Sequence, residues 1–207
     1  MKRIIYKIIV FTLMITLLVP SFTGCAAESD EELIATAKLL LEKSKTVNEI
    51  CYGKGLAFME EGGHSLSGYL EVTKEDRERY AVSSVEDIKA LVREVYSFAT
   101  CEQVDATIFA PIYTEIGYVS YRRYFDTTTE DGVSHLMVKK EYEPFVVGEV
   151  RYDNIRISSH KRNRAEILVD ITVTEGERSR TDKDISFAMR REEGVWKFDA
   201  LTYASIE

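Results

Sequence analysis

The chain has 207 residues, with 27 Lys and Arg, 35 Asp and Glu and a formal net charge of −8 at pH 7. Nucleic-acid phosphates repel an acidic protein, so nucleic acid is excluded as an expected partner. The length suits one domain once a leader is removed, since domains commonly hold about 100–150 residues and up to about 250.

The chain opens with a pattern typical of a secretory signal. MKRIIYK (1–7) holds three cations and no acid, IIVFTLMITLLV (8–19) is uncharged, and Pro20 and small residues follow. A basic region, a short apolar run and a small-residue cleavage zone make up such a signal. The apolar run is shorter than the roughly 20 residues of a membrane span, so a permanent transmembrane helix is less favoured.

Phe22-Thr23-Gly24-Cys25 resembles the lipobox of bacterial lipoproteins, which is typically Leu-small-Gly/Ala-Cys, with Phe22 in place of the usual Leu. The resemblance implies a signal peptide over residues 1–24, a lipid anchor on Cys25, a short tether over 25–30 and a domain over 31–207. It implies location at the extracytoplasmic face of the cell membrane, held durably by more than one acyl chain. The alternative is an ordinary secretory signal with an incidental Cys25.

A long helix is predicted over residues 30–52. Ser29 and Glu32 form a capping box at its start, and Gly53 suits a left-handed end. One apolar stripe follows the helical period: Leu33, Ala37, Leu40, Ser44, Val47 and Cys51.

The next segments mix irregular and helical patterns. Residues 53–72 are rich in glycine and predict an irregular stretch with a short helical turn over 56–60. A second helix is predicted over 83–98, capped by Ser83 and Glu86, with Ile88, Leu91, Val92, Val95 and Phe98 on one face. A shorter helix is expected over 100–109, closed by Pro111.

From about residue 113 the pattern indicates strands rich in β-branched and aromatic residues, over 116–125, 135–142, 149–158, 165–174, 184–191 and 195–203. Polar loops are expected between them, over 127–132, 158–164, 174–180 and 191–194, the last short enough for a hairpin. Helices followed by an antiparallel sheet predict an α+β domain with the helices packed on one face.

This order of elements resembles the NTF2-like (cystatin-like) superfamily, through the two helices and the closing hairpin ISFAMRREEGVWKFDALTY (185–203) with its Val195-Trp196-Lys197-Phe198-Asp199 strand. The resemblance implies a cone formed by N-terminal helices on a curved antiparallel sheet. A fainter resemblance, carried by GKGL, GYL and SVEDIKALVREVYS, is to secreted inhibitors of cell-wall DL-endopeptidases. It implies a function in binding.

Aromatic and basic residues give the candidate ligand site. An aromatic-lined cleft could bind a peptide or sugar, although tyrosine also favours strands for packing reasons alone. The candidates are Tyr96, Tyr113, Tyr118, Tyr121, Arg123 and Trp196. The basic run 161–164 could bind the anionic wall polymer or form a solvated hairpin loop.

Catalytic signals are weak. His64, His135 and His160 have no nucleophile or carboxylate at a diagnostic spacing, and the sequence predicts neither a metal site nor a cofactor. Cys51 and Cys101 could form a disulfide outside the cytoplasm or remain free. The prediction is a non-catalytic binding domain for a protein, peptide or cell-wall component; the alternative is a small-ligand-binding or enzymatic domain that uses the cone pocket.

Overall fold

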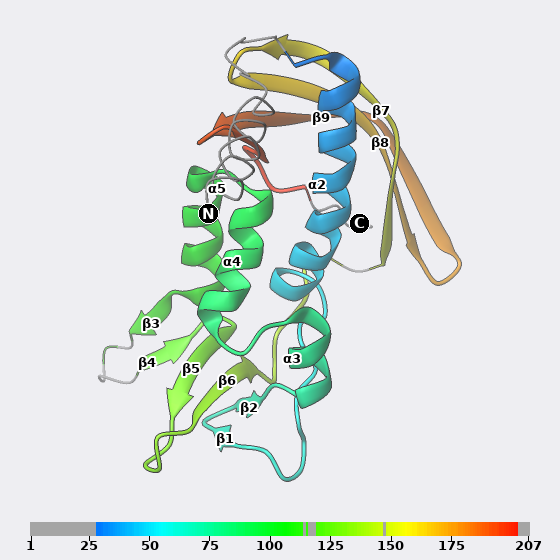
Figure 1. Cartoon of the computed structure of the whole chain (residues 1–207). Coiled ribbons are helices and arrows are strands. Elements are labelled where there is room, and N and C mark those ends of the chain that lie inside the picture. The colour runs from blue at the N-terminus through cyan, green and yellow to red at the C-terminus, as the bar shows by residue number, and fades with distance from the viewer. Residues whose placement is uncertain (1–27, 114, 116–118, 147, 203–207) are drawn as a thin grey trace, which may run out of the picture.

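The computed structural model describes residues 28–113, 115, 119–146 and 148–202. The predicted signal, Cys25 and Tyr118 lie outside the described residues. The described chain mixes helices with antiparallel sheets, so the predicted α+β class is confirmed (Figure 1). No helix among the described residues is long and apolar enough to cross a membrane.

The longest helix, α2 (Asp30–Cys51), begins where the sequence predicts. Ser29 and Glu32 form the expected capping box: Glu32 N–H donates to Ser29 Oγ at 3.2 Å, and Ser29 N–H donates to Glu32 Oε2 at 2.9 Å. The predicted left-handed Gly53 is wrong. Gly53 N–H bonds the Asn48 carbonyl at 2.9 Å, and the left-handed glycine comes two residues later, at Gly55.

A four-stranded antiparallel sheet forms the C-terminal part of the fold. Its order is β10 (Val195–Phe198), β9 (Arg178–Glu192), β8 (Arg164–Glu175) and β7 (Glu149–Lys161). The loops predicted over 158–164 and 174–180 are too long, because the strands continue into two-residue turns. The expected 191–194 hairpin forms, with positive φ at Glu193 and Gly194 as its tight turn requires.

The main core lies between α2, helix α4 (Val85–Val95) and this sheet. α2 packs against β7, β10 and α4, and α4 also packs against β10 (Figure 1). The alternation predicted for β8 is confirmed, because the apolar residues at every second position of the strand are buried in this core: Ile167, Val169, Ile171 and Val173. The same core includes Ile88 and Phe198.

A second four-stranded sheet has the order β1 (Ser65–Leu66), β2 (Tyr69–Glu71), β6 (Ser134–Lys139) and β5 (Tyr124–Thr128). A separate ribbon pairs β3 (Pro111–Tyr113) with β4 (Val119–Tyr121). The helical turn predicted over 56–60 is wrong. Phe58 instead forms an isolated antiparallel bridge with Val72, which extends the pairing around β2.

The remaining helices are short: α3 (Lys74–Tyr80), α5 (Phe98–Val104) and the π-helix η1 (Asp105–Phe109). The helix predicted over 83–98 is α4, which is shorter at both ends. Its capping box is Ser84 with Asp87, one residue later than predicted, because Asp87 accepts N–H bonds from both Ser84 and Ser83. Helix α3 was not predicted.

Candidate functional site

A cleft of about 430 Å³ lies where the carboxyl end of α2 meets η1, β3 and the segment after β6. Its lining includes Tyr52, Thr107, Arg122, Lys139, Tyr142 and Phe145. The Phe145 ring is 63% exposed, so an apolar ring at the cleft faces solvent. Such a hollow, with aromatic rings and a few charged groups, has the makeup of a ligand site.

The cleft wall is held by hydrogen bonds to the end of α2. Phe145 N–H and Val146 N–H both donate to the Tyr52 carbonyl, at 2.8 and 3.1 Å. The Tyr142 hydroxyl donates to the Cys51 carbonyl at 3.4 Å, and the rings of Tyr142 and Phe145 meet edge to face at 6.5 Å. The segment after β6 is therefore fixed to α2, and its aromatic rings are positioned in advance of any ligand.

Arg123 supports this wall from inside the protein. Its side chain is fully enclosed: Nη1 donates to the Cys51 carbonyl at 2.9 Å, Nη2 donates to the Gly53 carbonyl at 2.8 Å, and Cζ lies 3.9 Å from the centre of the Tyr142 ring. A cation at the carboxyl end of a helix satisfies free carbonyls and opposes the negative end of the helix dipole. A Cβ on Gly55 would lie 2.1 Å from Arg123 Nη2, so this backbone passes close to the guanidinium.

Two groups behind the cleft have strongly shifted acidity because they are buried. Burial raises the pKa of the Cys51 thiol to about 12 and that of the Tyr124 hydroxyl to about 12. The Tyr124 hydroxyl donates to the Ile50 carbonyl at 2.9 Å and accepts Leu56 N–H at 3.0 Å. Both groups are therefore neutral structural partners of α2 at physiological pH.

The cleft offers charged and aromatic binding groups. Arg122 and Lys139 are cations, Glu141 and Glu143 are anions, and the aromatic rings give flat apolar surfaces. None of the described residues that line it is a histidine or cysteine. Opposite charges beside aromatic faces suit a peptide segment, which carries both charged groups and apolar side chains.

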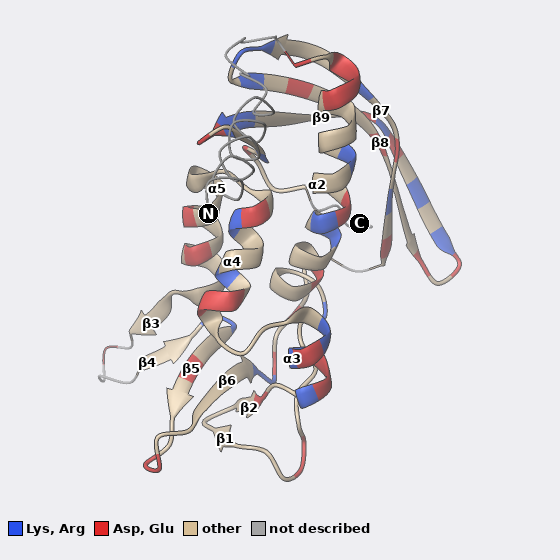
Figure 2. Cartoon of the chain, in the orientation of Figure 1, with Lys and Arg blue, Asp and Glu red and all other residues tan. Residues whose placement is uncertain are grey.

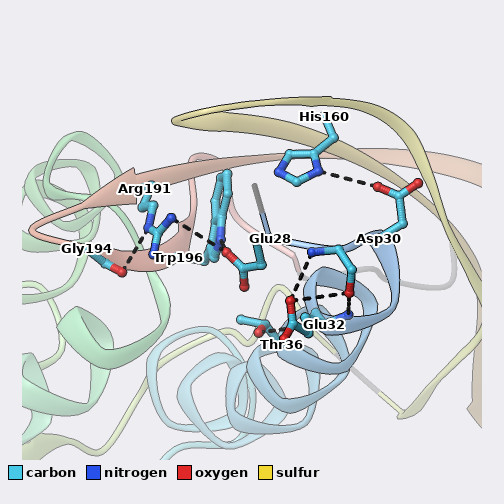
Figure 3. A network of polar contacts seen from close by, with 9 residues as sticks. Glu28, Asp30, Glu32, Thr36, His160, Arg191, Gly194 and Trp196 are labelled. Carbon is cyan, nitrogen blue, oxygen red and sulfur yellow. Dashed lines mark hydrogen bonds and ion pairs between the residues drawn. The ribbon is translucent and has the colours of Figure 1, made fainter. Parts of the chain in front are cut away.

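A second polar network secures the first described residue to the sheet (Figure 3). Trp196 Nε1 donates to Glu28 Oε2 at 2.6 Å, and Arg191 Nη1 lies 3.7 Å from the same oxygen. His160 packs edge to face on Trp196 at 5.9 Å, and its Nδ1 lies 3.4 Å from Asp30 Oδ1. The start of α2 is thereby attached to both hairpins at this end of the sheet.

A third cluster surrounds the buried carboxylate of Glu71. Glu71 Oε2 accepts His64 N–H at 3.0 Å, while Oε1 lies 3.1 Å from His135 Nδ1 and 3.3 Å from Arg77 Nη2. The two imidazole rings stack at 5.0 Å. Among the described residues, no group of three or more acidic, histidine or cysteine side chains has the geometry of a metal site.

The structure does not gather the predicted ligand residues into one cleft. Tyr113 is 76% exposed on β3, Tyr121 is half-buried and stacks on Phe125 at 4.5 Å, and Arg123 is buried behind the cleft. Tyr96 is also buried, where its hydroxyl donates to Asn48 Oδ1 at 2.7 Å. The predicted Trp196 belongs to the network of Figure 3, and Tyr118 is outside the described residues.

Among the aromatic residues of the cleft, the sequence reasoning missed Tyr52 and Phe145. EYEPF (141–145), at the end of the strand predicted over 135–142, is the local signal that could have indicated Phe145. Cys51 and Cys101 are both free thiols, so they do not form the disulfide that the sequence left open.

Comparison with protein-family models found no match, and a search of curated proteins found no significantly similar sequence.

Proposed function

We propose that this protein is a lipoprotein anchored through Cys25 at the extracytoplasmic face of the cell membrane, with a non-catalytic domain that binds a peptide segment of an envelope protein or of the cell wall. The observation that carries the binding proposal is the cleft beside Tyr142, with exposed Phe145 and both signs of charge. We further propose an NTF2-like relationship, supported by a long first helix on an antiparallel sheet and a closing hairpin with Trp196.

The anchoring proposal is supported by the order of features around Cys25. A basic segment, an uncharged run and a Thr23-Gly24 pair precede the cysteine. Mass spectrometry of the intact native product tests it: we expect a chain that begins at Cys25 and carries the added mass of acyl chains. A chain that retains Met1, or an unmodified Cys25, contradicts the proposal.

The binding proposal is supported by the way the cleft is built. A preformed wall loses little conformational freedom on binding, which favours affinity for a short segment. Arg122 and Lys139 suit a ligand carboxylate, and Glu141 and Glu143 suit an amino group. This balance favours a peptide with both charges over a neutral sugar.

Calorimetric titration of the full chain with cell-wall stem peptides, and with peptides from a co-purifying envelope protein, tests the assignment. We expect Phe145→Ala and Arg122→Ala each to weaken binding by roughly tenfold, since a lost aromatic or charge-assisted contact costs about 1–3 kcal/mol. Tyr113→Ala is the matched control, because this ring is exposed outside the cleft lining. Binding that is insensitive to both cleft substitutions would place the ligand elsewhere.

A further inference from the structure

The end of the fold that carries Glu28 is held close to the predicted anchor. Only Ala26 and Ala27 separate Cys25 from Glu28, and three residues of fully extended chain span at most about 11 Å. Glu28 is itself fixed to the sheet by Trp196 and Arg191. A membrane attached at Cys25 must therefore lie beside this end of the domain.

Basic side chains gather at the same end. The β7–β8 turn carries exposed Lys161, Arg162 and Arg164, and within the described part of the chain none of the three has an ion-pair partner (Figure 2). The turn lies against the β9–β10 hairpin, because Arg191 N–H donates to the Asn163 carbonyl at 3.0 Å. The cations are thus adjacent to the residue that holds Glu28.

Acidic groups also lie at this end: Glu31, in the first turn of α2, is exposed, and others make polar contacts. Asp30 faces His160, Glu28 is held by Trp196, and the Glu192 carboxylate accepts Phe98 N–H at 3.0 Å. Glu193, in the β9–β10 turn, is exposed. The segment 161–164 itself carries three cations and no acid, in a protein whose formal charge changes from −8 to −11 once the three cations of residues 1–24 are removed.

Two exposed apolar side chains lie beside the neighbouring β9–β10 turn. Phe98, the first residue of α5, is 70% exposed, and Val195, the first residue of β10, is 55% exposed. Both line one hollow beside the β9–β10 turn. Surfaces that rest on anionic bilayers combine exposed apolar groups with basic side chains.

We propose that this anchor-proximal surface, defined as Lys161, Arg162, Arg164, Phe98 and Val195, rests on the anionic lipid headgroups around the anchor and fixes how the domain stands on the membrane. This inference rests on the proposed lipidation of Cys25. Attraction of basic side chains to an anionic surface acts within a screening length of about 8 Å at physiological salt, and the short tether keeps Glu28 within about 11 Å of the anchor.

Amide hydrogen exchange on the full lipidated chain tests the proposal. The chain is reconstituted into vesicles of phosphatidylcholine alone and into vesicles that also contain phosphatidylglycerol. We expect exchange in residues 159–165 to slow only on the anionic vesicles, and this protection to be lost at high salt. Residues 175–178, at the opposite end of the sheet, should exchange equally on both.

Two charge-reversed chains separate a specific surface from general attraction. Lys161→Glu, Arg162→Glu and Arg164→Glu together should abolish the protection. The control is Arg178→Glu, Arg180→Glu and Lys183→Glu, the same change of charge on the β8–β9 hairpin, and it should retain the protection. Equal loss in both chains, or equal protection on neutral vesicles, overturns the proposal.

Two further outcomes are distinguishable. If a soluble polyglycerol phosphate protects residues 159–165 of the detergent-solubilised chain and anionic vesicles do not, the surface binds wall polymer and the membrane assignment fails. If intact mass shows Cys25 unmodified, both the anchor and the orientation fail. A lipidated Cys25 with an unprotected turn overturns the orientation alone.

Discussion

Arg123 donates from Nη1 to the carbonyl oxygen of Cys51 across 2.9 Å, which joins the residue before β5 to the last residue of α2. The buried guanidinium therefore caps the carboxyl end of α2. It also links the helix end to the Tyr142 ring of the cleft, which lies on the guanidinium.

Substitution Arg123→Ala should lower the free energy of unfolding by about 3 kcal/mol, because it leaves the Cys51 and Gly53 carbonyls without their charged donor. Urea denaturation measures the change. The neighbouring Arg122→Ala removes an exposed cation and should change stability by no more than about 0.5 kcal/mol. Equal losses of unfolding free energy for the two substitutions would show that Arg123 does not cap the carboxyl end of α2.

Glu71 should make the stability depend on acidic pH. Burial is the largest influence on Glu71 and raises its pKa, but His64 N–H, His135 and Arg77 together outweigh it and hold the pKa below its ordinary value of 4.5. A carboxylate with a depressed pKa stabilises the fold above about pH 4.5, and this contribution is lost as the pH falls through the folded-state pKa.

We therefore expect Glu71→Gln to lower the free energy of unfolding at pH 7 by about 1–3 kcal/mol, since it weakens charged hydrogen bonds of a buried group. The difference in unfolding free energy between the variant and the wild-type protein should become smaller as the pH falls below 4.5. Urea titrations at several pH values measure it. Glu61→Gln, at an exposed loop position, should show no such narrowing; a constant difference for Glu71→Gln would contradict the assigned ionisation.

Cys51 and Cys101 should react with an alkylating reagent at very different rates, because their thiols differ in solvent exposure. Burial raises the pKa of both, to about 12 for Cys51, and only Cys101 is partly exposed. Alkylation of the native protein at pH 8, followed by peptide mass mapping, should modify Cys101 slowly and leave Cys51 intact until the protein is unfolded. Rapid native labelling of Cys51, or a disulfide between the two, would contradict the structure.

The network around Glu28 can be followed through the single tryptophan of the chain, Trp196. Glu28→Ala removes the acceptor of the indole N–H and should cost about 1–2 kcal/mol of stability, while shifting the Trp196 emission. Fluorescence-detected urea denaturation measures both. Glu31→Ala, at the exposed neighbouring position on α2, should leave the emission unchanged. An unaltered emission spectrum for Glu28→Ala would mean that the hydrogen bond between Trp196 and Glu28 does not form.

Local signals predicted the elements whose contacts are local. The capping box of Ser29 and the apolar stripe of α2 lie within one segment, and so does the alternation of β8. Helix α3 was missed because none of its residues is buried, so KEDRERY carries no apolar face. The β8–β9 loop was predicted too long because Arg178 to Asp182 are polar, yet they pair with β8 in a largely exposed hairpin.

The candidate site was less predictable because it joins segments that are distant in sequence. Tyr52 directly follows α2, Arg122 lies between β4 and β5, and Tyr142 and Phe145 follow β6. Nothing in the pair Arg122-Arg123 tells which guanidinium is enclosed, because that depends on the register of β5 against the end of α2. Only the packed structure separates the cation that lines the cleft from the one that supports it.

Helix α2 has 22 residues, and at a rise of 1.5 Å per residue it measures about 33 Å. Glu28 precedes one end and Tyr52 follows the other, so this helix separates the proposed point of attachment from the candidate cleft. In the proposed anchored protein, with α2 perpendicular to the membrane, the length of this helix would set the distance between the lipid surface and the cleft. The cleft would then bind its ligand in the envelope layer above the membrane.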